Sequence, residues 1–325
     1  MSLYHAFFAL TGSIIDYAGT FAPASLSLDD SLKKAFHFRK SSKHPWIFGK
    51  MALTMPHLKE LSAARLLEAG ADGNACLFTA IGSFPEGGKA EDFLAKIEWD
   101  LRELRRLEDR WFYSSIRQSV VCYETRLPAS WSLTADDDSR QLIQALERFR
   151  ILSRGRLDLF LELDSSQLAK VGVSGLLKTV TQWQEQSDED SSFDIGIKLR
   201  TGGKSVPSLT VLATAISEAS SYGISVKATQ GLHECYSHGN DYGFINLFAS
   251  LAFSFSLGQG GFTSKNIEDC LKSPGSAFSF TKESLRWGEF QLSAEQIETA
   301  RRVHRATFGS CSLDEPEASI LKENL

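Results

Sequence analysis

The sequence is poor in the residues that mark extracellular and membrane-spanning proteins. Its five cysteines are an odd number, lie far apart and form no C-x-x-C pair, a pattern that fits neither a disulfide framework nor a structural zinc site. The most apolar run, at residues 244–257, includes Asn246 and is shorter than the roughly 20 residues that span a bilayer. No basic residue precedes the short apolar stretch at residues 4–10, as a secretory signal would require. We therefore expect a soluble, cytoplasmic protein with reduced thiols and no membrane association.

An excess of basic charge is also absent. The 325 residues contain 35 Lys and Arg against 40 Asp and Glu, a formal net charge of −5. Nucleic-acid-binding proteins normally carry a basic excess or a basic stripe, and acidic residues interrupt the cluster of Arg102, Arg105 and Arg106. Neither a G-x-G-x-x-G nor a Walker motif occurs. The sequence therefore predicts no nucleic-acid partner, and we assign no cofactor.

What the chain does contain is a regular alternation of short apolar runs and amphipathic segments. Between the apolar runs, Pro56 begins a helix predicted over 56–69, and Pro207 precedes another over 209–222 that Gly223 ends. Strict βαβα alternation implies a parallel sheet. The seven candidate strands are residues 13–17, 46–50, 75–80, 120–125, 157–163, 195–200 and 224–229.

An eighth strand must close such a sheet into a barrel. The candidates are residues 277–287 and 307–312, and we favour 307–312 because the segment before it carries two short alternating runs, at 278–280 and 285–287, that are typical of a β-hairpin. No linker or internal repeat divides the chain. The sequence therefore predicts an α/β protein: one (β/α)₈ TIM barrel over residues 1–325, with a β-hairpin insertion at about 260–292 before the last unit.

Basic side chains are predicted to face the barrel axis from two adjacent strands. Residues of a barrel strand alternate between the helix layer and the interior. Because apolar residues take the helix-facing positions of the sixth and seventh strands, Lys198 and Arg200 point inward, as do Lys227 and Thr229.

Acidic side chains converge on the same region. The alternation turns Glu124 of the fourth strand inward, and likewise Glu162 and Asp164 of the fifth, while Asp16 and Lys50 end the first and second strands. Barrel enzymes keep their active sites at the carboxyl ends of the strands. Two interpretations are open: paired charges that only fill the barrel, or a catalytic centre. If catalytic, one of two neighbouring lysines should have a lowered pKa and act as an amine nucleophile toward carbonyl compounds.

Two lysine motifs resemble a known family. Lys198-Leu-Arg-Thr-Gly202 resembles the K-x-x-T-G that ends the sixth strand of deoxyribose-phosphate aldolases, and Lys227-Ala-Thr-Gln-Gly231 resembles the K-x-x-G-G of their seventh strand. Asp16 falls in a segment similar to their first-strand motif. The resemblance implies that Lys198 forms a Schiff base, that Lys227 lowers its pKa and that Asp16 is a polar partner. Glu124 is the candidate for the place of the family's fourth-strand aspartate.

The resemblance also bears on substrate binding. The family's glycine-rich phosphate cradle is matched by Gly231 and by the segment 308–312, whereas Arg200 and the segment 232–238 depart from the family. Across its whole length, the chain is similar to a group of uncharacterised bacterial TIM-barrel proteins that end in F-G-S-C-S-x-D-E-P, here residues 308–316. Our substrate-binding candidates are Arg200, Thr201, Gly202, Thr229, Gly231, Glu162, Asp164, Gly309 and Ser310.

The favoured hypothesis is a class I, Schiff-base aldolase-like lyase acting on a small carbonyl or phosphorylated sugar-like molecule. Arg200 would hold an anionic group of that substrate. One alternative is a metal-dependent lyase or isomerase that uses His233 with carboxylates at the mouth; no H-E-x-x-H motif occurs, and we assign no metal ligand. The other is a non-catalytic barrel that binds a small molecule; a homo-oligomer is compatible with either. The catalytic candidates are Lys198, Lys227, Asp16, Glu124 and His233.

Overall fold

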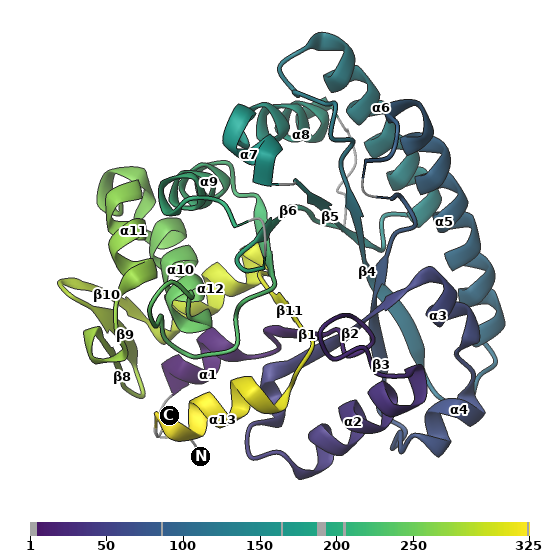
Figure 1. Cartoon of the computed structure of the whole chain (residues 1–325), viewed down its shortest axis with the longest axis horizontal. Helices are drawn as coiled ribbons and strands as arrows, with labels where there is room; N and C mark the ends of the chain where they lie inside the picture. Colours follow the sequence, from purple (N-terminus) through teal and green to yellow (C-terminus); the bar gives the residue numbers. More distant parts are fainter. Residues whose placement is uncertain (1–4, 86, 164, 187–192, 204–205, 324) are drawn as a thin grey trace.

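Eight parallel strands close into a barrel (Figure 1), which confirms the predicted (β/α)₈ fold. The computed structural model describes residues 5–85, 87–163, 165–186, 193–203, 206–323 and 325. Around the barrel the strands follow the order β1-β11-β7-β6-β5-β4-β3-β2, so the last strand closes onto the first. The strands are β1 (Ile15–Tyr17), β2 (Phe48–Thr54), β3 (Cys76–Ile81), β4 (Gln118–Arg126), β5 (Asp158–Glu162), β6 (Ile195–Arg200), β7 (Ser225–Thr229) and β11 (Phe308–Ser310).

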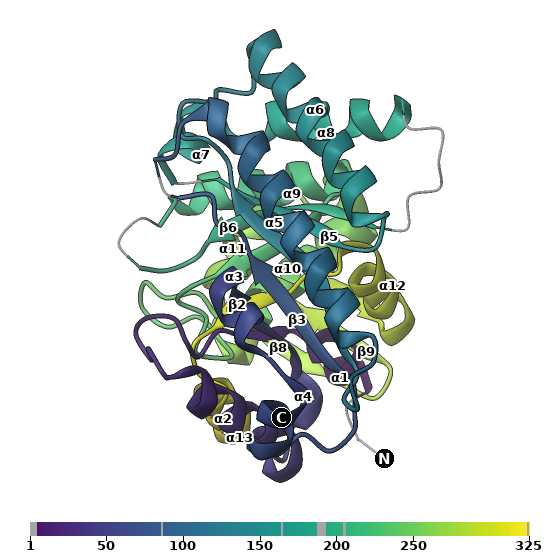
Figure 2. The same cartoon turned by 90° about the vertical axis from the view of Figure 1, so that its right-hand side faces the viewer.

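Helices surround the barrel, and α5 and α6 run along one side of it (Figure 2). Three acidic residues open α6, where the helix dipole favours negative charge. The helices are α1 (His5–Thr11), α2 (Leu28–Ser41), α3 (Met55–Glu60), α4 (Ala63–Glu68), α5 (Ala90–Trp111), α6 (Asp136–Ser153), α7 (Ser165–Val171), α8 (Ser174–Gln186), α9 (Leu209–Ser221), α10 (Phe244–Gly261), α11 (Ser264–Lys272), α12 (Ala294–His304) and α13 (Asp314–Lys322), with 3₁₀ turns η1 (Pro45–Ile47) and η2 (Gly275–Ala277).

The predicted strand alternation holds in β6. Ile195, Ile197 and Leu199 are buried in the apolar core, whereas Lys198 and Arg200 line a pocket inside the barrel. Gly196 lies on the inward side and has no side chain because a Cβ atom there would come 2.4 Å from the ring of Phe160. The β6 sequence therefore sets an apolar outer face against a polar inner face.

The prediction of one helix over 56–69 is wrong. The segment forms two short helices, α3 and α4, because Leu61 between them is extended, with ψ 136°. Thr54 accepts a hydrogen bond at the start of α3, and Ser62 accepts one from the Arg65 amide at the start of α4. Two separate N-caps outweigh the helical spacing of the leucines. A second difference concerns β2, which continues to Thr54, so Lys50 lies within that strand and not at its end.

The insertion before the last unit is larger than a hairpin. Strands β8 (Phe278–Phe280) and β9 (Ser284–Trp287) are the predicted arms, and β10 (Phe290–Ser293) adds a third antiparallel strand. This sheet packs on α1 and α10; for example, the rings of Phe7 and Phe280 meet edge to face, 5.3 Å apart. It therefore extends the apolar core on the outside of the barrel.

The apolar run at residues 244–257 forms the first part of α10, and its residues are buried as far as Ser254. Among the described residues, no helix is long and apolar enough to cross a membrane. The five cysteines are all described, and none forms a disulfide.

Candidate active site

A pocket of about 960 Å³ opens at the carboxyl ends of the barrel strands. Its lining includes the last residues of several strands, among them Arg126 of β4, Glu162 of β5, Arg200 of β6 and Thr229 of β7. Residues from the loops that follow β1, β3, β6, β7 and β11 add to this lining. The pocket therefore lies where barrel enzymes bind their substrates.

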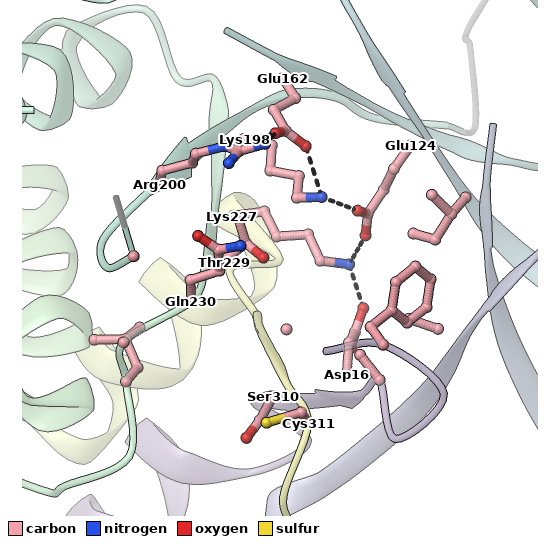
Figure 3. Close-up of a pocket in the computed structure, with 18 of the residues that line it drawn as sticks. Asp16, Glu124, Glu162, Lys198, Arg200, Lys227, Thr229, Gln230, Ser310 and Cys311 are labelled. Carbon is pink, nitrogen blue, oxygen red and sulfur yellow. Dashed lines mark hydrogen bonds and ion pairs between the residues drawn. The ribbon is translucent and has the colours of Figure 1, made fainter. Parts of the chain in front are cut away.

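An alternating chain of charges forms the inner surface of this pocket (Figure 3). The Lys198 ammonium lies 2.8 Å from Glu124 Oε2 and 2.9 Å from Glu162 Oε2. Lys227 forms ion pairs with the other oxygen of Glu124 and with Asp16. Glu124 therefore bridges both lysines. In space, the charged groups follow one another in the order Glu162, Lys198, Glu124, Lys227, Asp16.

Asp16 is the last group in this series of ion pairs, and it is fully buried. Its Oδ2 accepts a hydrogen bond from Thr79 Oγ1 at 3.0 Å, in addition to the contact with Lys227. Lys50 of β2 lies 3.5 Å from the other carboxylate oxygen, Oδ1. A buried carboxylate is stable only when charges and donors compensate it, and Asp16 has such partners on three other strands.

The prediction that one lysine would have a lowered pKa is wrong. Burial lowers the pKa of Lys198, but Glu124 and Glu162 outweigh burial and raise it. The pKa of Lys227 is likewise raised, because Asp16 and Glu124 outweigh its complete burial. Burial alone would raise the pKa of Glu124, yet the two lysines lower it to about 2. The carboxylates between the lysines thus cancel the like-charge repulsion on which the prediction rested.

The two lysines differ in access. The Lys198 side chain is 11% exposed, whereas that of Lys227 is 1% exposed and its ammonium lies 5.4 Å from the centre of the Phe160 ring. The residues are direct neighbours in the β6–β7 register. A molecule in the pocket therefore has better access to the Lys198 side chain than to that of Lys227.

Two guanidinium groups lie nearer the strand ends than Lys198. Arg200 places Nε 3.0 Å and Nη2 2.9 Å from Glu162 Oε1, and Arg126 places its Nε 3.6 Å from the same oxygen. Arg126 was not among the predicted site residues, although it follows Glu124 by two residues and so shares its inward direction. The same alternation that identified Glu124 was sufficient to find it.

Other predicted site residues line the pocket from β7, β11 and their loops. Thr229, Gly231, Gly309 and Ser310 belong to this lining. His233 also lines it, 42% exposed, with Nδ1 2.6 Å from a carboxylate oxygen of Glu315 in α13. Lining residues that sequence analysis did not single out include Phe21, Phe84, Gln230 and Tyr242.

Two predicted residues lie outside the pocket lining. Thr201 is buried outside the pocket lining and donates a hydrogen bond to the Gln230 carbonyl at 2.6 Å. Gly202 packs against Gly231, and a Cβ on Gly202 would lie 2.4 Å from the Gly231 Cα. These two residues join the loops after β6 and β7. Asp164 lies outside the described residues.

The described residues provide no ligand set for the metal-dependent alternative. No group of three or more His, Cys, Asp or Glu side chains in this part of the chain is placed to hold a metal ion. His233 faces Glu315, and the Glu124 and Glu162 carboxylates contact lysines.

The likeness of the chain to known proteins is distant. No protein-family model matches the chain, and no curated protein matches its sequence. Among solved structures, the chain is similar to a "putative deoxyribose-phosphate aldolase" from Toxoplasma gondii, with 11% identity, a TM-score of 0.44, and coverage of 93% of this chain and 96% of that one. It is also similar to xylanase B from Clostridium stercorarium F9, with 13% identity, a TM-score of 0.34, and coverage of 84% and 86%. Likenesses this distant assign no activity.

Proposed function

We propose that this pocket is the active site of an aldolase-like lyase in which the Lys198 amine forms a Schiff base with a carbonyl substrate. The position of Lys198 carries the proposal. Its ammonium lies between Glu124 and Glu162, and its side chain is more exposed than that of Lys227, the other lysine of the pocket lining. An amine beside two proton-accepting groups in a substrate-sized pocket is suited to imine chemistry.

The ionised resting state of Lys198 is compatible with this chemistry because imine formation conserves charge. A lysine ammonium and a carbonyl give a cationic iminium and one molecule of water. The carboxylates of Glu124 and Glu162 that stabilise the ammonium therefore also stabilise the iminium. They oppose only the brief neutral form of the amine that attacks the carbonyl carbon.

The same carboxylates supply the proton transfers that the reaction needs. Glu162, 2.9 Å from the Lys198 amine, accepts its proton while the amine attacks the carbonyl carbon. The proton returns to the carbinolamine oxygen, which leaves as water. In the cleavage step the electron pair of the broken carbon–carbon bond moves into the iminium, and a carboxylate accepts the proton of the substrate hydroxyl. Protonation of the resulting enamine and hydrolysis restore Lys198.

The position of Arg200 suggests that the substrate carries an anionic group, which the guanidinium would bind. Its guanidinium is 19% exposed, lines the pocket and lies two residues beyond Lys198 on the same face of β6. A planar guanidinium suits the paired oxygens of a carboxylate or phosphate. The substrate class is therefore an anionic carbonyl compound.

Borohydride trapping tests the proposal. The protein is incubated with acetaldehyde, pyruvate, dihydroxyacetone phosphate or 4-phenyl-2-oxobutyrate, and sodium borohydride then reduces any imine to a stable adduct that intact-mass spectrometry detects. We expect an adduct of one substrate unit on the wild-type protein and at least a tenfold lower yield on Lys198→Met.

The control is Lys265→Met, which removes an exposed lysine and should keep the wild-type yield. If no carbonyl compound labels the wild-type protein, or if Lys198→Met labels as well as wild type, the proposal fails.

A further inference from the structure

The pocket is chemically divided between the two halves of the barrel. One side carries most of the charged groups, which are Glu124, Arg126, Glu162, Lys198, Arg200 and Lys227 on strands β4, β5, β6 and β7, together with Glu234 and Asp241 in the loop that follows β7. Among the described lining residues, β1, β2, β3 and the loops that follow them supply one charged side chain, Asp16, which is buried against Lys227. A molecule in the pocket therefore meets charge on one side only.

The opposite side is an apolar wall. It runs across three adjacent strands, because β2 lies between β1 and β3 in the barrel. The wall comprises Phe21, Ala22, Pro23, Ala52, Ile81 and Phe84. Phe84 is held in place by an edge-to-face contact with Phe93, 5.2 Å between ring centres, so the wall is anchored in the core of the protein.

The size of the pocket matches this division. Its volume of about 960 Å³ lies at the upper end of the roughly 300–1,000 Å³ typical of pockets for drug-sized ligands. A three-carbon carbonyl compound bound at Lys198 would leave the apolar wall against water. A polyhydroxylated substrate would leave hydroxyl groups facing a surface that cannot bond to them, which is unfavourable.

We infer that the substrate is an amphiphilic carbonyl compound, with an anionic end at Arg200 and an aromatic or branched apolar part against the apolar wall. The inference rests on the proposed function for the position of the carbonyl group, at Lys198. It adds the apolar part, which is recognised by burial of apolar surface and not by hydrogen bonds.

Calorimetric titration with compounds that cannot form an imine tests the inference independently of the chemistry. The probes are 4-phenylbutyrate, butyrate and 4-phenylbutan-1-ol. We expect wild-type protein to bind 4-phenylbutyrate at least tenfold more tightly than either of the others, because only this probe satisfies both sides of the pocket. Equal affinity for 4-phenylbutyrate and butyrate would overturn the inference.

Substitutions in the apolar wall test whether this wall causes the preference for 4-phenylbutyrate over butyrate. Ala22→Asp places a charge on an exposed position of the wall and should reduce the preference for 4-phenylbutyrate over butyrate to less than threefold. Phe21→Ser should reduce it in the same direction. The matched control, Ala64→Asp, changes an exposed alanine in the first turn of α4 and should leave the preference unchanged. A preference unchanged in both wall variants would contradict the inference.

The two proposals fail separately. Tight binding of 4-phenylbutyrate without a borohydride adduct from any of the four carbonyl compounds would support the amphiphilic pocket and overturn the lyase. Trapping of pyruvate on Lys198 with no preference for the phenyl probe would support the lyase and overturn the amphiphilic substrate.

Discussion

At the scale of single residues, Glu124 connects the two lysines of the pocket. It contacts Lys198 with one carboxylate oxygen and Lys227 with the other, and it is almost completely buried. Each lysine also pairs with a second carboxylate, Lys198 with Glu162 and Lys227 with Asp16. Removing one charged side chain from this network therefore leaves its buried partners without a compensating charge. Breaking a buried pair from one side costs more than the pair itself contributes.

Loss of the Lys227 charge should destabilise the protein strongly. Lys227→Met leaves Asp16 and Glu124 facing each other without their shared cation, and we expect the free energy of unfolding to fall by about 3–5 kcal/mol. Urea denaturation followed by circular dichroism measures this change.

The comparison is Lys265→Met, whose lysine forms an exposed ion pair with Asp269. Exposed ion pairs contribute little to the free energy of unfolding, so this variant should unfold at a urea concentration close to the wild-type midpoint. Equal midpoints for Lys227→Met and Lys265→Met would show that the buried network does not stabilise the barrel.

The stability of the network should also depend on pH. Because the folded-state pKa of Glu124 is lowered to about 2 from an ordinary value of 4.5, its contribution is present above pH 4.5 and is lost as the pH falls toward 2. We expect the free energy of unfolding of the wild type to decrease over this interval, and that of Glu124→Gln to decrease less steeply. Urea denaturation at pH 5, 4 and 3 compares the two, with Glu283→Gln, on the surface, as the control. Parallel slopes for wild type and Glu124→Gln would contradict the assigned ion pairs.

At this scale, the sequence was sufficient to predict which side chains point into the barrel, but not which ion pairs they form. Strand alternation alone identified Lys198, Lys227, Glu124 and Glu162 as inward. It did not show that Glu124 separates the lysines, because that contact depends on side-chain conformations across three strands. The expected sign of the lysine pKa shifts was therefore wrong.

At the scale of elements, α13 holds the loop between β7 and α10 at the pocket mouth. Ser319 of α13 donates a hydrogen bond to Glu234 Oε2 at 2.8 Å and accepts one from the Cys235 amide at 2.8 Å. His233 of the same loop faces Glu315, also in α13. The C-terminal helix therefore positions lining residues that are distant in sequence.

Ser319→Ala should loosen this loop. The substitution leaves the buried Cys235 amide without its acceptor, which costs about 1–3 kcal/mol. Hydrogen–deuterium exchange should become faster in residues 231–243 and stay unchanged in β4. Ser279→Ala, at an exposed position of β8, is the control. Unchanged exchange in residues 231–243 would contradict the role assigned to α13.

The errors in the predicted elements have local causes. The helix over 56–69 is divided because Leu61 is extended and Ser62 starts a new helix, a capping residue that leucine spacing conceals. The third strand of the insertion follows the Gly288-Glu289 turn, with Gly288 at φ +57°. A two-residue turn with glycine is a hairpin signal, so β10 was predictable from the sequence.

At the scale of the whole molecule, the regular βα spacing was sufficient to predict the barrel and its closing strand. The division of the pocket into a charged half and an apolar wall was not predictable, because the wall combines loop residues such as Phe21 and Phe84 that no strand alternation orients. The barrel brings these loops next to the lysines, and only this arrangement gives the pocket two chemically different sides.

The most direct test of the central claim is the position of the trapped carbonyl group. Wild-type protein is treated with 4-phenyl-2-oxobutyrate or pyruvate and with borohydride, digested, and mapped by tandem mass spectrometry. The account predicts that the reduced adduct lies on Lys198, with Lys227 unmodified because its side chain is 1% exposed. An adduct carried mainly by Lys227 or by surface lysines, or no adduct at all, would contradict it.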